Sequence, residues 1–284
     1  MAFSRYAFAF VALFLLAACS PLGIYNSIIP KDSGVTVAAS GVAYGSDPRQ
    51  RLDVYRPEGA SRGIVVFVYG GSWSSGARGD YSFVGNAFAA QGYTTVIPDY
   101  RLVPQVRYPA FVEDTAKAVA WAYRNAATFD SDPRRLFVAG HSAGAYNAMM
   151  VALAPEFLRA EGLSPRILRG VAGLSGPYDF LPLDVRSTRD AFGAASDLAS
   201  TQPVNRVSAG QGVDAIFLGH GEADDLVYPR NSRHLAERLR RVGKTVTTKF
   251  YAGVDHPGTL LAIAKNRRDE VPVLADVIDF LDRN

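Results

Sequence analysis

Short runs of apolar residues, mostly β-branched or aromatic, recur along the chain and alternate with segments of helical periodicity. The runs are short for helices, and their uninterrupted hydrophobicity is typical of strands that are buried on both faces. Helical patterns lie between most of the runs, and a last one lies near the C-terminus. We predict strands at 64–69, 93–98, 136–139, 170–174, 215–218 and 246–251, and helices at 80–91, 110–125, 143–153, 231–242 and 276–281.

This alternation predicts an α/β fold with a mainly parallel central sheet and helices on both faces. Residues 41–43 and 52–55 flank a turn-rich stretch and predict an antiparallel hairpin at one edge of the sheet. The chain has 284 residues, of which 48% are hydrophobic and 20% charged, which fits one globular domain with a substantial core. Residues 178–212 lack a clear strand or helix signal and predict a small cap insertion over an open, shallow site.

The most informative motif is the G-x-S-x-G pattern at residues 140–144, between a predicted strand and a predicted helix. Two glycines allow a sharp turn from strand to helix, because no Cβ atom obstructs it. Ser142 then lies exposed at the tip of the turn, and the N-terminus of the next helix lies beside it. The motif predicts a nucleophilic serine.

A serine hydroxyl needs a general base, and four histidines compete for this role. His141 adjoins Ser142 on the turn, His220 ends the apolar run 215–219, and His234 lies on the basic face of a predicted helix. His256 lies in a loop near the C-terminus, as the order serine, acid, histidine requires. Elimination therefore predicts His256 as the base.

The acid that orients the histidine is expected in the loop that follows the strand at 215–218. Glu222, Asp224 and Asp225 all lie in this loop. A carboxylate with this role must be partly buried and aligned with the imidazole, which the residues alone do not decide.

The motifs found so far resemble those of the α/β-hydrolase superfamily, in its branch of small bacterial esterases and lipase-like carboxylesterases. The H-G-G-G-W segment of that branch is similar to residues 69–73, where tyrosine replaces the first histidine and serine the third glycine. The resemblance implies an α/β-hydrolase fold with a minimal cap. It also implies an oxyanion hole built from the backbone N–H groups of Gly71, Ser72 and Ala143.

The same resemblance bears on the acid. The H-G-x-x-D segment of this branch matches residues 220–224, which implies that Asp224 is the acid, with Asp225 as the alternative. Further likeness lies in D-Y-R-L-x-P at residues 99–104. We expect Arg101, Asp53 and Asp114 to form ion pairs that shape loops.

The sequence thus predicts a hydrolase of carboxylic esters that needs neither a cofactor nor a metal, with Ser142, Asp224 and His256 as its triad. Trp73, Tyr81 and Tyr178 are candidates for an aromatic wall that binds a small ester substrate. Two alternatives remain: an arylformamidase, other amidase or peptidase with the same triad, or a non-catalytic lipoprotein that binds a ligand.

The N-terminus resembles an export signal. Residues 6–18 are uncharged after Arg5, which is too short a stretch for a membrane span and typical of a signal peptide. Residues 16–19, Leu-Ala-Ala-Cys, resemble a bacterial lipoprotein cleavage box. We expect a signal at 1–18, lipidation at Cys19, a tether at 19–37 and the hydrolase domain at 38–284.

The location follows from this signal. Lipid on Cys19, the one cysteine of the chain, is expected to anchor the protein in a membrane, and Ser20 after it resembles the pattern for the outer membrane, facing the periplasm. The formal net charge of +3 is too small to indicate binding to nucleic acid. The oligomeric state is not predicted.

Overall fold

The computed structural model of the protein describes residues 20–284, and an eight-stranded sheet forms the centre of this part. The strand order is β1-β2-β4-β3-β5-β6-β7-β8. β1 and β2 form the predicted antiparallel hairpin at the edge, β2 also pairs antiparallel with β4, and all other pairs are parallel. The strands are β1 (Val35–Ala43), β2 (Arg51–Pro57), β3 (Ile64–Val68), β4 (Thr94–Pro98), β5 (Leu136–His141), β6 (Leu168–Leu174), β7 (Ala215–Gly221) and β8 (Thr245–Tyr251).

The burial of the strands explains their composition. Every residue of β3, β4, β5 and β7 is buried, which is the environment that continuous apolar runs require. β8 lies at the edge of the sheet, and most of its residues are only partly buried. The predicted mainly parallel sheet is therefore confirmed.

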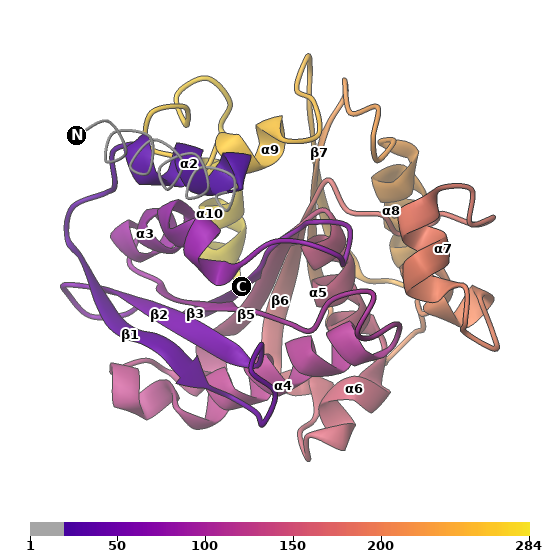
Figure 1. Cartoon of the computed structure of the whole chain (residues 1–284), viewed down its shortest axis with the longest axis horizontal. Coiled ribbons are helices and arrows are strands. Elements are labelled where there is room, and N and C mark those ends of the chain that lie inside the picture. The colour runs from indigo at the N-terminus through magenta and orange to yellow at the C-terminus, as the bar shows by residue number, and fades with distance from the viewer. Residues whose placement is uncertain (1–19) are drawn as a thin grey trace, which may run out of the picture.

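Helices cover both faces of the sheet, and Figure 1 shows α3 and α10 together on one side and α4 and α6 on the other. α5 contacts β3, β5 and β6 and packs against α4 and α6. In α8 the apolar side chains are buried and the arginines exposed, as its amphipathic pattern requires. The helices are α2 (Pro21–Ile28), α3 (Ser82–Ala90), α4 (Ala110–Arg124), α5 (Ala143–Leu153), α6 (Pro155–Ala160), α7 (Arg186–Phe192), α8 (Arg230–Arg241), α9 (Gly258–Leu261) and α10 (Val273–Arg283).

The part of the predicted tether that the structure describes, residues 20–37, packs against the domain. They contain α2 and the start of β1, and α2 is docked on the domain. Ser20 Oγ accepts a bond from the N–H of Gly23 and donates one to Asp80, 2.8 Å each, and Asn26 Nδ2 donates to the carbonyl oxygen of Gly79 at 2.8 Å. The partners of α2 lie far along the chain, so the local sequence carried no signal of this docking.

The segment between β6 and β7 contains α7 and two 3₁₀ turns, Ala199–Thr201 and Pro203–Asn205. Within residues 20–284, no helix has the length and hydrophobicity needed to cross a bilayer. The predicted signal at 1–18 and the lipidation site Cys19 lie outside the described residues.

Candidate active site

Ser142 lies between the last residue of β5 and the first residue of α5. Its backbone has φ 55° and ψ −125°, a conformation that side chains with a Cβ atom rarely adopt. The turn requires glycine at both positions. A Cβ atom at Gly140 would overlap the backbone of Gly144, and one at Gly144 would overlap the backbone oxygens of Val68 and Tyr69. The structure thus holds Ser142 on a strained strand-to-helix turn at the carboxyl edge of the sheet.

The side chains of His256 and Asp224 extend from loops at the same edge. His256 follows β8, and its Nε2 lies 2.8 Å from Ser142 Oγ. Asp224 follows β7, and its Oδ2 lies 2.8 Å from His256 Nδ1. Asp225, the alternative acid, is exposed, whereas Asp224 is buried. The structure therefore brings Ser142, His256 and Asp224 into one line of contacts.

The carboxylate of Asp224 is surrounded by donors. Its Oδ1 accepts the N–H of Leu226 at 3.1 Å and of Val227 at 2.8 Å. Its Oδ2 also lies 3.2 Å from Nε2 of His220. Burial by itself raises the pKa of a carboxyl, but the bonds from His220, His256 and the backbone outweigh it and hold the pKa of Asp224 well below its usual range. Asp224 is accordingly an anion at neutral pH.

His141 is turned away from the serine. It is 5% exposed, and its Nε2 lies 3.0 Å from the backbone oxygen of His256. Burial, with a smaller effect of the neighbouring His256, lowers the pKa of His141 to about 3. A neutral His141 therefore donates to the backbone of the candidate base.

The predicted oxyanion residues are close to the serine, although not equally. Ser72 and Ala143 line the same cavity as Ser142, whereas Gly71 lies one residue earlier and does not line it. Ala143 begins α5, so its N–H has no acceptor within the helix. No carbonyl oxygen of residues 20–284 accepts the N–H of Ser72, which has φ 52° in a tight turn. These two N–H groups are available to a bound oxygen atom.

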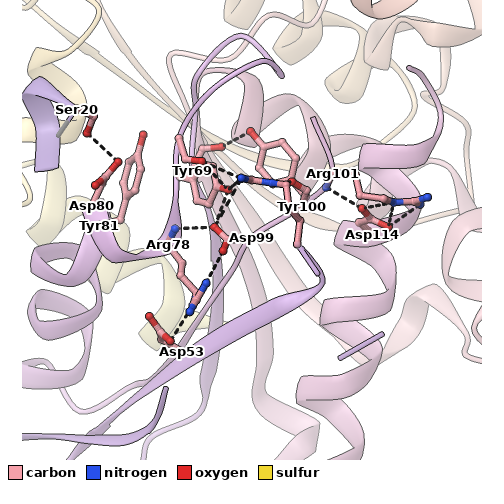
Figure 2. A network of polar contacts seen from close by, with 12 residues as sticks. Ser20, Asp53, Tyr69, Arg78, Asp80, Tyr81, Asp99, Tyr100, Arg101 and Asp114 are labelled. Atoms are coloured by element: carbon pink, nitrogen blue, oxygen red, sulfur yellow. Dashed lines mark hydrogen bonds and ion pairs between the residues drawn. The ribbon is translucent and has the colours of Figure 1, made fainter. Parts of the chain in front are cut away.

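A network of polar contacts stabilises the turn that contains Ser72, and Figure 2 shows this network around Tyr69 and Asp99. Tyr69 donates its hydroxyl to Asp99 at 2.8 Å, and the Tyr100 hydroxyl donates to the backbone oxygen of Tyr69 at 3.0 Å. Arg78 bridges Asp99 and Asp53 at 2.5 and 2.9 Å. Tyr69, which replaces the histidine of the related motif, therefore fixes the start of the turn.

The expected ion pairs are present. Asp53 pairs with Arg78, and Arg101 pairs with Asp114 at 2.8 Å, so these charges shape loops as predicted. Figure 2 shows the Arg101–Asp114 pair beside Tyr100, away from the Arg78 bridge.

A cavity of about 240 Å³ opens at Ser142. Trp73 lines it, but is only 2% exposed, because its ring packs edge-on against Tyr146 and Phe192. Other apolar walls come from two segments, 177–188 and 226–231. Pro177, Phe180, Leu181, Pro182, Val185, Leu226, Val227 and Tyr228 make up the apolar lining from these segments.

Two predicted wall residues do not line the cavity. Tyr81 is 5% exposed and stacks on Tyr69 at 5.0 Å between ring centres. Tyr178 is fully buried, with its ring against Gly173 and Gly176. Both are core residues, because glycines and neighbouring rings leave space for them inside the domain.

Comparison with known proteins assigns the family. The sequence profile of the BD-FAE family matches residues 52–239, more than half of the chain. The chain belongs to the BD-FAE family.

Individual relatives of this BD-FAE family member are named as esterases. Isoprenylcysteine alpha-carbonyl methylesterase ICME of Arabidopsis thaliana is 28% identical over 78% of this chain and 56% of its own length. Esterase LipC of Mycobacterium tuberculosis is 30% identical over 72% of this chain and 55% of its own length. The chain spans little more than half the length of these curated relatives.

Solved structures give the fold. Esterase B from Lactobacillus rhamnosis superposes with a TM-score of 0.81 at 19% identity, covering 100% of this chain and 96% of that one. A bacterial heroin esterase gives a TM-score of 0.74 at 20% identity, covering 92% and 88%. This BD-FAE family member has the α/β-hydrolase fold, with an eight-stranded, mostly parallel sheet in the described residues.

Sequence reasoning missed several residues at the site of this family member. His220 was considered only as a base and set aside, yet it contacts Asp224. Its place in the H-G-x-x-D segment was the available signal. The cavity walls Phe180, Leu226 and Tyr228 follow no motif, and no sequence signal distinguishes them from other loop residues.

Proposed function

We propose that the protein is a serine-dependent hydrolase of carboxylic esters that works through an acyl-enzyme. The observation that carries this proposal is the unbroken line of contacts from Ser142 Oγ to His256 Nε2 and from His256 Nδ1 to Asp224 Oδ2, 2.8 Å each. Both distances lie within hydrogen-bond range without any rearrangement. The relatives named above, which are esterases, agree with it.

In the first half of the reaction, Ser142 Oγ attacks the ester carbonyl carbon while its proton passes to His256 Nε2. Asp224 holds the imidazole by its Nδ1–H and stabilises the imidazolium that forms. Collapse of the tetrahedral intermediate breaks the bond to the alcohol oxygen, which leaves with the proton from His256. Ser142 is then acylated.

In the second half, water replaces the alcohol. His256 takes a proton from the water, whose oxygen attacks the acyl carbon, and then returns the proton to Ser142 Oγ as the carboxylic acid departs. The N–H groups of Ser72 and Ala143, which line the cavity, are assigned to the oxyanion of both tetrahedral intermediates, whereas Gly71, the third predicted donor, does not line the cavity. The loss of one such donor typically costs about 3 kcal/mol.

The cavity indicates the kind of ester. Its exposed lips are Leu181, Val185, Leu226 and Tyr228, which supply apolar surface to a group next to the scissile bond. Its volume of about 240 Å³ is below the usual range of ligand pockets, about 300–1,000 Å³. We assign esters with one modest apolar group as the substrate class.

The test compares the wild type with Ser142→Ala on p-nitrophenyl esters of increasing acyl length and on formanilides. The proposal expects turnover of esters, a burst of p-nitrophenol equal to the enzyme concentration, and loss of turnover in the variant. A kcat/KM that is much higher on formanilides would make the protein an amidase. Undiminished hydrolysis by Ser142→Ala, or none by the folded wild type, would refute the proposal.

We further propose that lipid on Cys19 anchors the protein in the outer membrane, facing the periplasm. Two observations support a membrane-facing α2: the helix begins two residues after Cys19, and Ile24 and Ile28, one turn apart, are 41% and 75% exposed. Incorporation of labelled fatty acid into the wild type and not into Cys19→Ala tests this assignment. A soluble wild type without label would refute it.

A further inference from the structure

His220 has a buried position beside the proposed triad. It is the penultimate residue of β7, is 0% exposed, and lies opposite Phe250 in the register of β8. Because His220 lies in a strand and not in a loop, the sheet fixes the direction of its side chain. It reaches the loop that carries Asp224 from inside the domain.

The contacts of the two ring nitrogens of His220 show which one donates a hydrogen bond to Asp224. Nε2 lies 2.7 Å from the carbonyl oxygen of Val227 and 3.2 Å from Oδ2 of Asp224. Both oxygens only accept hydrogen bonds, so Nε2 must carry a proton that they share. Nδ1 lies 2.7 Å from the hydroxyl of Ser232 on α8, which can donate to it. The contacts therefore place a donor at Nε2 and pair Nδ1 with the hydroxyl of Ser232.

Asp224 consequently receives N–H groups from four directions. Leu226 and Val227 bind Oδ1, whereas His256 and His220 both approach Oδ2. A carboxylate held only by its own loop can rotate with that loop. His220 connects it to β7 and, through Ser232, to α8, which are rigid elements of the domain.

We propose that His220 is a positioning residue, whose Nε2–H aims the carboxylate of Asp224 at Nδ1 of His256. The proposal rests on the proposed function, because it assumes that Asp224 orients the base. His220 touches neither substrate nor the reacting atoms and acts only through Asp224. Its contact with the backbone oxygen of Val227 also fixes the part of this loop that follows Asp224.

Two substitutions distinguish the roles of the two ring nitrogens of His220. The amide nitrogen of glutamine can occupy the place of Nε2, so His220→Gln keeps the donor to Asp224. Asparagine is shorter, reaches only the place of Nδ1, and removes that donor. We expect kcat to fall by about 10- to 100-fold in His220→Asn, as for loss of a hydrogen bond to a charge, with KM unchanged. We expect His220→Gln to retain most of kcat.

A double-mutant cycle tests the route of action. If His220 works through Asp224, His220→Asn costs little further kcat in an Asp224→Asn background. Urea unfolding should show that both His220 variants are folded, so that a lower kcat is not a lower folded fraction. Equal losses in the Gln and Asn variants, additive losses in the cycle, or an unchanged kcat in His220→Asn would each overturn the proposal.

A readout independent of turnover separates this inference from the proposed function. The proton on His256 Nδ1 gives a low-field NMR resonance that reports its bond to Asp224. We expect the resonance to persist in His220→Gln and to shift or broaden in His220→Asn. An unchanged resonance in His220→Asn overturns the role of His220 even if no ester is hydrolysed, whereas absent ester turnover with the expected shift overturns only the function.

Discussion

Replacement of His141 by glutamine is expected to weaken the dependence of stability on pH. The wild-type imidazole is buried against the backbone of His256, and this burial lowers its pKa to about 3. In the unfolded chain a histidine titrates near 6.5. Below about pH 6.5 the unfolded chain therefore binds a proton that the folded protein does not.

The sign and size of the effect follow from this difference. Since the unfolded state holds the extra proton, the unfolding free energy falls as the pH decreases, by about 1.4 kcal/mol per pH unit between about 6.5 and 3. From about pH 7 to about pH 4.5 the contribution of His141 amounts to about 2.5 kcal/mol. Glutamine has no proton to gain, but its amide can still donate to the backbone oxygen of His256.

The assay is urea unfolding of wild type, His141→Gln and His141→Asn at both pH values. Groups common to all three proteins cancel in the comparison, so the loss of stability should be about 2.5 kcal/mol smaller in both variants. His141→Asn is the control for the hydrogen bond: it should be less stable than His141→Gln by about 1 kcal/mol at neutral pH, with the same weak pH dependence. Equal losses in wild type and His141→Gln would show that the buried imidazole is protonated.

Three further predictions concern other parts of the site. Asp224→Asn should lower kcat by about 10⁴-fold and Asp225→Asn by less than about 3-fold, and a larger loss in the second would identify Asp225 as the acid. Gly144→Ala should lower the unfolding free energy by about 3 kcal/mol or more, because its Cβ overlaps the backbone oxygen of Tyr69, whereas Gly59→Ala, in open space, should stay within about 1 kcal/mol of wild type. Tyr69→Phe should lower the free energy of unfolding in urea by about 1.5–3 kcal/mol and should lower kcat more than it raises KM. An unaltered kcat would show that the network does not support the oxyanion hole.

The parts of the site that sequence indicated are those encoded by local rules. The strand runs were recognisable because parallel strands buried on both faces need continuous apolar residues. The glycines around Ser142 were recognisable because the turn excludes Cβ atoms. The carboxyl ends of parallel strands share one edge, which is why the residues after β5, β7 and β8 meet. Burial of Asp224 and exposure of Asp225, which decide their different contacts, required the folded structure.

The parts that sequence did not indicate depend on contacts that only the folded structure shows. Tyr178 follows β6 as a wall residue would, but its ring fills space left by Gly173 and Gly176. α2 is stabilised by contacts of Asn26 with residues 79–83, and a buried asparagine gives no apolar signal. In both cases the hydrophobic pattern does not show which residue the side chain will contact.

The loop after β7 both lines the cavity and binds the carboxylate of Asp224. The backbone N–H groups of Leu226 and Val227 bind Asp224, while their side chains line the cavity. A side chain at these positions can therefore change the cavity without removing a bond to the carboxylate. His220 binds the backbone oxygen of Val227 and not its side chain, so it tolerates the same changes. Backbone contacts thus hold the proposed chemistry constant while side chains of one loop are free to alter which ester fits.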